Sequence, residues 1–201
     1  KNQNDINLSG LLGSTYYLMN KQDEAVKIWK EALTKQGDNI NAYRIIANYA
    51  LQNRAFDEAI NVLQKGSDIS SDKTSFALEL ANLYSITMKY GEATKQFCNI
   101  LLKQPNQVSI IKGRISSYLM QFEAFAQSIK VINEYIDDNE DNPVFYDLAA
   151  YVYQQNDDYK SAYQNVLIWD KLSNSNGSQI FNFAQSALDE SQFEYAVIGY
   201  N

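Results

Sequence analysis

The sequence predicts an all-α fold, an α-α superhelix in which two-helix repeats follow one another along the chain. The first observation is a set of six small residues at intervals of 34, 34, 35, 34 and 34, which we call the ruler positions: Ala25, Ala59, Ala93, Ser128, Ala162 and Ala196. The second is an apolar helical face after each ruler position, and the third is another such face before it. A fixed period near 34 is typical of a helix–turn–helix solenoid.

The second helix of each repeat begins just before its ruler position. Three, four and seven residues beyond that position, most repeats carry apolar side chains, such as Ile28, Trp29 and Ala32. This spacing places them on one face of a helix. Among these residues we expect Trp29, Ala93, Phe97 and Ala162 to be structural. The expected second helices are 22–36, 56–69, 91–104, 125–137, 159–172 and 192–201, with ends uncertain by two to four residues.

The first helix of each repeat shows the same spacing, most clearly at Ala77, Leu80, Ala81 and Tyr84. Small residues let two antiparallel helices approach closely, and the aromatic residue fills the space toward the next repeat. The copies around Asn48 and Ser116 are weaker. The expected first helices are 6–19, 40–53, 74–88, 108–121, 143–155 and 178–189.

These motifs resemble the tetratricopeptide repeat family over nearly the whole chain. The residues that carry the resemblance are Leu12, Gly13 and Tyr16, Leu80, Ala81 and Tyr84, Ala25, Trp29 and Ala32, and Pro105 at the end of a repeat. The resemblance implies one right-handed solenoid over residues 1–201. Its repeats would be about 6–39, 40–73, 74–108, 109–142 and 143–176, with a partial repeat at 177–201.

Two repeats depart from this pattern. Asn48 and Gly66 replace the usual residues in the second repeat, and the fourth has Ser128 and one extra residue. The packing is expected to differ there while the period is kept. Near the end of the sequence, Phe193, Val197 and Tyr200 lie at helical spacing and indicate a helix that continues. We therefore expect a fragment of a longer protein, and the alternative is a naturally frayed terminus.

The composition excludes most catalytic chemistry. The 201 residues contain no histidine and one cysteine, which removes the triads, dyads and zinc sites that need imidazole. Cys98 is expected to be a small, half-buried residue. The Gly10–Thr15 run lacks the lysine of a phosphate loop, and Gly13 is better explained as a packing residue. The sequence therefore predicts no enzyme and no cofactor.

Metal, membrane and nucleic-acid sites are also disfavoured. The acidic run 137–142 has Asn142 where a calcium loop needs glycine and Leu148 where it needs glutamate, so a solvated turn is expected. No stretch approaches 18 consecutive apolar residues, so no membrane span is predicted. Because the net charge is −7, the chain would repel phosphate backbones.

In the family that the chain resembles, the first helices line a concave groove. The residues that flank the buried positions of these helices are Ser14, Tyr17, Ile45, Tyr49, Gln52, Leu78, Asn82, Ser85, Ser117, Met120, Asp147, Tyr151 and Gln154. Tyrosines and neutral amides suit an extended peptide or a helix. The alternative is that they are ordinary solvated helix residues.

Two specialised modes of the family fit poorly. A carboxylate clamp would need cations that here come only from Lys112 and Arg114, with Asn82 supplying an amide, and the asparagine ladder of other arrays is absent. We therefore expect a non-catalytic protein–protein interaction scaffold that binds a protein or peptide segment. The alternative is a targeting or assembly arm of a larger multidomain enzyme or cell-envelope protein. The sequence does not distinguish cytoplasm from periplasm.

Overall fold

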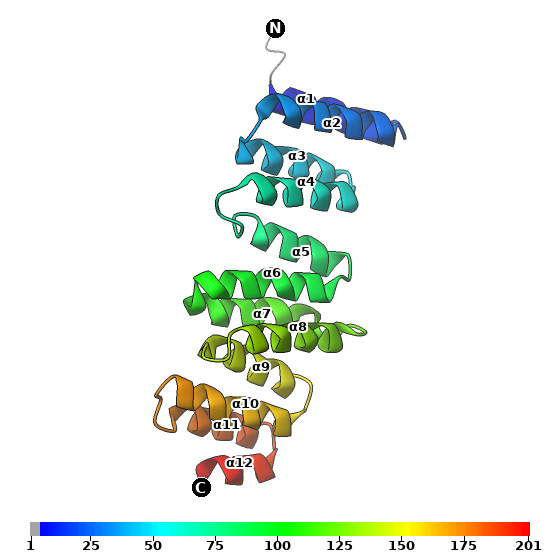
Figure 1. Ribbon diagram of the computed structural model, residues 1–201. Coiled ribbons are helices and arrows are strands. Elements are labelled where there is room, and N and C mark those ends of the chain that lie inside the picture. The colour runs from blue at the N-terminus through cyan, green and yellow to red at the C-terminus, as the bar shows by residue number, and fades with distance from the viewer. Residues whose placement is uncertain (1–4) are drawn as a thin grey trace. The chain divides into compact units, whose positions relative to one another are not determined.

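The structure is a computed structural model that describes residues 5–201, and these residues form twelve α-helices, one 3-10 turn and no strand (Figure 1). The helices are α1 (Ile6–Leu18), α2 (Gln22–Gln36), α3 (Ile40–Gln52), α4 (Phe56–Ile69), α5 (Ala77–Ile86), α6 (Tyr90–Lys103), α7 (Val108–Leu119), α8 (Ala124–Asp138), α9 (Pro143–Gln154), α10 (Tyr159–Leu172), α11 (Ser178–Asp189) and α12 (Phe193–Tyr200), with the 3-10 turn η1 (Pro105–Gln107) before α7. The all-α prediction is confirmed, and each predicted helix is present with ends that differ by at most three residues.

The largest difference is the start of α5, which lies three residues after its predicted position. Asp72 explains it, because its Oδ1 accepts hydrogen bonds from the backbone nitrogen of Thr74 at 2.8 Å and from the Thr74 hydroxyl at 2.7 Å. Such a side-chain turn competes with the helix for the same backbone groups. The helix therefore begins only at Ala77.

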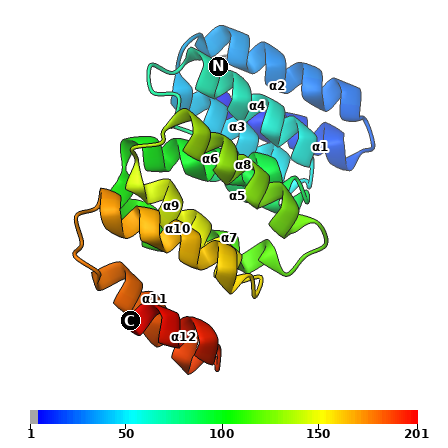
Figure 2. The same cartoon turned by 60° about the horizontal axis from the view of Figure 1, so that its bottom comes forward.

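The chain divides into two compact units. The first ends at Thr87 and contains α1 to α5, and the second begins at Met88 and contains α6 to α12. In the first unit α1 packs on α2 and α3 on α4, and in the second α9 packs on α10 and α11 on α12 (Figures 1 and 2). The single solenoid with the repeat limits given above stays a prediction.

Close packing explains the glycines of α1. A Cβ atom on Gly13 would lie 2.1 Å from Nε1 of Trp29, and one on Gly10 would lie 2.1 Å from the ring of Tyr49. The Trp29 Nε1 also donates to the carbonyl oxygen of Gly10 at 3.1 Å. Gly13 is therefore a packing residue, as predicted, and the Gly10–Thr15 run is part of a helix instead of a phosphate loop.

The ruler positions lie at the centre of the core. Five of the six are fully buried, and the sixth, Ala196, is 2% exposed. Trp29 and Phe97 are buried beside them. Cys98 was expected to be half-buried and is in fact completely buried in α6, which raises the pKa of its thiol well above the ordinary value.

In the fourth repeat, the two helices of the repeat are not each other's main packing partners. α7 and α8 approach each other at few points, and α8 packs mainly on α6 and α9.

The turns inside the repeats share one backbone feature. Five residues before each ruler position, one non-glycine residue has a left-handed conformation, with φ between 59° and 62°: Asn20, Arg54, Met88, Glu123, Asp157 and Ser191. At the end of α1, the backbone nitrogen of Asn20 donates to the carbonyl oxygen of Tyr17 at 3.0 Å. The backbone nitrogen of Lys21 donates to the carbonyl oxygen of Tyr16, also at 3.0 Å. This is the Schellman arrangement, and α3, α9 and α11 end in the same way.

Candidate functional site

The candidate site in the second unit is a pocket of about 150 Å³ on the first helices of three repeats. α7, α9 and α11 form its walls and α10 supplies two further side chains. The lining residues are Lys112, Asp147, Ala150, Tyr151, Gln154, Val166, Trp169, Gln179, Asn182, Phe183 and Ser186. Aromatic and amide side chains make up most of this surface.

Lys112 occupies the centre of the charged part of the pocket. Its Nζ lies 2.5 Å from Oδ1 of Asp147, which connects α7 to α9. The same nitrogen lies 5.5 Å from the ring centroid of Tyr151 and 5.4 Å from that of Trp169. These distances are within the range of cation–π contacts. The ammonium group is therefore neutralised and held in place from three sides.

Asp147 is an unusually buried carboxylate, since its side chain is only 7% exposed. Burial raises the pKa of Asp147, and the attraction of Lys112 opposes this effect without cancelling it. Each charge of the pair therefore offsets the free-energy cost of burying the other.

The remaining polar groups of the pocket are neutral. The side chain of Gln154 donates from Nε2 to the hydroxyl oxygen of Ser186 at 2.6 Å, which joins α9 to α11. Gln179 and Asn182 lie on the α11 side of the same pocket. Amide side chains can both donate to and accept from a peptide backbone. The arrangement can therefore satisfy an extended main chain beside two aromatic rings.

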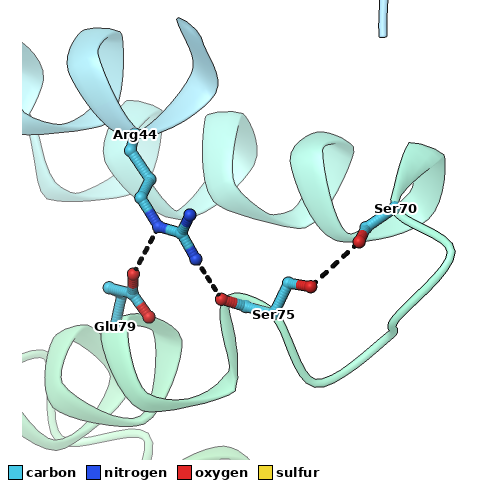
Figure 3. A network of polar contacts seen from close by, with 4 residues as sticks. All are labelled: Arg44, Ser70, Ser75 and Glu79. Carbon is cyan, nitrogen blue, oxygen red and sulfur yellow. Dashed lines mark hydrogen bonds and ion pairs between the residues drawn. The ribbon is translucent and has the colours of Figure 1, made fainter. Parts of the chain in front are cut away.

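The first unit has a similar pocket of about 170 Å³ between α3 and α5. Arg44 is one of its lining residues, with its Nε 2.9 Å from Oε1 of Glu79 and its Nη2 2.5 Å from the Ser75 carbonyl oxygen (Figure 3). The Ser75 hydroxyl in turn lies 2.9 Å from that of Ser70. The guanidinium group also lies 4.6 Å from the ring centroid of Phe76. Asn82 is part of the pocket lining.

The structure brings only part of the predicted groove together. Lys112, Asp147, Tyr151 and Gln154 share the pocket of the second unit, and Asn82 lines that of the first. Ile45 and Ser85 are half-buried outside both pockets, Ser14 is buried with its hydroxyl bonded to Asn53, and the remaining exposed residues of the set are Gln52, Leu78, Arg114, Ser117 and Met120. Their role in binding stays a prediction.

Two predicted groove tyrosines pack within the first unit. The ring of Tyr17 stacks on that of Trp29, with centroids 6.1 Å apart, so it lies against α2. The ring of Tyr49 lies over Gly10 of α1. Neither tyrosine lines the pocket between α3 and α5.

Sequence reasoning missed several pocket residues, namely Arg44, Glu79, Trp169, Gln179 and Asn182. The spacing of the charged residues in the sequence could have predicted their pairing. Arg44 and Glu79 are 35 residues apart, as are Lys112 and Asp147, so opposite charges recur one repeat apart on first helices. Trp169 gave no such signal, because it belongs to a second helix.

Two further properties concern the described residues alone. Within residues 5–201, no three side chains of histidine, cysteine, aspartate or glutamate come together in a way that could hold a metal ion. None of the helices in this range has the length and apolar character needed to cross a membrane.

No protein family model matches the chain, and no curated protein sequence matches it. Among solved structures, MamA of strain AMB-1 is 14% identical, with 83% of this chain and 98% of that chain covered and a TM-score of 0.42. MamA from Desulfovibrio magneticus RS-1 is also 14% identical, covers 82% and 92%, and has a TM-score of 0.41. The fold assignment therefore rests on the helices of the chain itself.

Proposed function

We propose that this chain is a non-catalytic interaction scaffold that binds a peptide or protein segment on the first helices of its repeats. The observation that carries the proposal is the pocket of the second unit, to which α7, α9 and α11 all contribute side chains. A segment lying there would contact three consecutive repeats at once. Burial of aromatic surface supplies affinity in such sites, and amides fix the main chain.

The charge state of the pocket favours a neutral part of the ligand. The one ammonium group, Lys112, is already bonded to Asp147, and the other polar side chains are amides and a hydroxyl. A ligand carboxylate or phosphate would have to compete with Asp147 for Lys112. We therefore expect little dependence of affinity on salt, because exposed ionic contacts are the ones that salt screens.

The experiment is a selection of binding peptides from a random library displayed on phage, followed by titration of a labelled synthetic peptide by fluorescence anisotropy. Tyr151→Ala should weaken binding at least tenfold, as expected for a central aromatic residue of an interface. Gln154→Ala should weaken it less. Gln155→Ala is the matched control, since Gln155 is the exposed neighbour outside the pocket.

Two outcomes decide the proposal, and one further variant tests its extent. Equal affinity of the wild type, Tyr151→Ala and Gln154→Ala would contradict it and would move binding to another face. A loss of more than tenfold in affinity between 50 and 500 mM salt would instead support the clamp formed by Lys112 and Arg114. Tyr49→Ala, measured with the same peptide, tests whether the predicted groove extends onto the first unit.

A further inference from the structure

The turn between α10 and α11 contains an asparagine followed by a glycine, Asn176 and Gly177, and this is the only such pair in the 201 residues. Asn176 is exposed, and the backbone φ angles of the two residues are 50° and 86°. Because glycine has no Cβ, its backbone nitrogen is unusually accessible to a neighbouring side chain. The side-chain amide of Asn176 and the nitrogen of Gly177 are the two groups that react in a spontaneous deamidation.

The reaction needs these two residues and one water molecule. The backbone nitrogen of Gly177 loses its proton and attacks Cγ of Asn176, which closes a five-membered succinimide ring. The bond from Cγ to Nδ2 breaks, and Nδ2 leaves as ammonia. Water then opens the ring at either carbonyl carbon. Cleavage of the new bond to Cγ gives aspartate, whereas cleavage of the original peptide bond gives isoaspartate, in which the main chain runs through Cγ.

Asp170 holds the attacking nitrogen in place. Its Oδ2 accepts a hydrogen bond from the backbone nitrogen of Gly177 at 2.9 Å, and the residue is only 8% exposed. Hydrogen bonds to a carboxylate are among the stronger ones in proteins. A carboxylate is far too weak a base to remove an amide proton, so this bond keeps the proton on the nitrogen. Ring closure requires the nitrogen to leave Asp170 and turn toward Asn176, and the bond therefore opposes the reaction.

We propose that Asn176 is a site of spontaneous deamidation and that the hydrogen bond from Gly177 to Asp170 sets its rate. The product carries a new negative charge next to Gly177, whose nitrogen is bound by a carboxylate, and like charges disfavour each other. Isoaspartate also lengthens the main chain by one atom. Both changes act at the start of α11, which begins at Ser178 and carries the pocket residue Gln179. Deamidation therefore loosens this end of α11.

The experiment is incubation at 37 °C and pH 8, followed by peptide mapping with mass spectrometry, which locates each converted asparagine. Asn176 of the folded wild type should convert at least tenfold more slowly than in 8 M urea. In folded Asp170→Ala, Asn176 should convert at least fivefold faster than in the folded wild type. In urea the two proteins should convert at the same rate, because the hydrogen bond is absent from both.

Asn174 is the internal control in the same turn. It has a similar φ of 51° but precedes a serine, Ser175, whose backbone nitrogen donates to the carbonyl oxygen of Asp170 at 3.1 Å. Asp170→Ala keeps this carbonyl group. Conversion of Asn174 should therefore change less than twofold between the folded wild type and folded Asp170→Ala.

Two further variants separate the hydrogen bond from general stability. Asp170→Asn keeps one acceptor oxygen and should give an intermediate rate, and it serves as the test if Asp170→Ala does not fold by circular dichroism. Ala93→Leu destabilises the same unit from α6 without touching this turn, and it should leave the rate at Asn176 within twofold of the wild type.

Three results would overturn the proposal. Equal or slower conversion of Asn176 in both folded Asp170 variants would show that the bond does not protect the site. An equal acceleration by Ala93→Leu would assign the rate to global unfolding. Aspartate as the only product, without isoaspartate, would indicate direct hydrolysis of the side-chain amide instead of ring closure by Gly177.

Discussion

Thr94 and Ser128 lie one repeat apart and face each other across α6 and α8, with their hydroxyl oxygens 2.9 Å apart. The Thr94 oxygen also lies 3.0 Å from the hydroxyl of Tyr118 and 2.9 Å from the carbonyl oxygen of Tyr90. All three hydroxyl-bearing residues are buried, and burial raises the pKa of Tyr118 to about 12. The only ruler position without alanine is thus part of a buried polar network that connects three helices.

Ser128→Ala should destabilise the fold by about 1–2 kcal/mol, although it restores the alanine of the other five ruler positions. The reason is that a buried hydrogen bond is lost. Thr94→Val should cost more, because it leaves the hydroxyls of Ser128 and Tyr118 without this partner. Urea unfolding of the two single variants and the double variant forms a cycle, and the double variant should lose less than the sum. An increase in stability for Ser128→Ala would contradict the network.

Phe97→Ala should cost about 3–5 kcal/mol, because Phe97 is 2% exposed and its removal leaves a cavity. Ala93→Leu on the same helix should cost about 1–3 kcal/mol through overpacking at a fully buried position. Denaturant melts measure both changes. Values within a few tenths of a kcal/mol of the wild type would mean that the helices are packed in another register.

The fold could be predicted from the sequence because one steric pattern occurs six times. The copy around Ser116 is weak by itself, but the common period fixes the helix positions there as well. The pocket could be predicted only in part. Tyr151 and Gln154 follow from their place beside buried residues of one helix, whereas Trp169 enters from a second helix.

The repeat turns show a similar limit. All six carry a residue with positive φ, yet none of these residues is glycine, so composition gave no signal. Arg54, with φ of 60°, adopts this conformation because the Schellman hydrogen bonds at the end of α3 require it. Only the three-dimensional structure shows that the same backbone strain recurs in each repeat.

Arg54→Gly should therefore raise the free energy of unfolding by about 0.5–1 kcal/mol. Glycine avoids the cost of a left-handed conformation, which is about 1–2 kcal/mol for most residues, and part of this gain is offset by its greater freedom in the unfolded chain. Asn20→Gly is the matched control at the same turn position, with φ of 59°. Because asparagine tolerates this conformation, its replacement should change stability little. A less stable Arg54→Gly, measured by urea unfolding, would argue against strain at this turn.

Asp170 is a buried carboxylate that sequence patterns did not single out. Its Oδ2 accepts from the backbone nitrogen of Gly177 at 2.9 Å and its Oδ1 from that of Gln179 at 3.0 Å, so it holds the start of α11 from α10. Asp170→Ala should cost about 2–3 kcal/mol, because it removes charge-assisted bonds to nitrogens at a helix start. Asp170→Asn, which keeps one acceptor oxygen, should cost less.

The measurement for Asp170 is thermal or urea unfolding, with Asp137→Ala as the control. Asp137 is an exposed residue of α8, and its replacement should change stability by only a few tenths of a kcal/mol. If Asp170→Ala behaved like this control, the two hydrogen bonds would contribute nothing to the stability of the second unit.

Lys112→Met should destabilise the second unit by about 3 kcal/mol at pH 7, because it leaves the buried Asp147 carboxylate without its counter-charge. Asp147 already has a raised pKa through burial, and loss of Lys112 removes the main influence that lowers it. A carboxyl group whose pKa is higher in the folded state binds more protons there than in the unfolded chain. Stability therefore falls as pH rises above the unfolded pKa of about 3.9 and through the higher folded value.

The difference between Lys112→Met and the wild type should accordingly grow from pH 4 to pH 7 and shrink toward acid. Urea unfolding of both proteins at pH 4, 5.5 and 7 measures it, and the comparison removes titrations that the two proteins share. The double variant Lys112→Met with Asp147→Asn should regain much of the loss at pH 7, since no unpaired charge remains. A difference that is independent of pH would show that the lost cation–π contacts with Tyr151 and Trp169, and not the charge of Asp147, account for the effect.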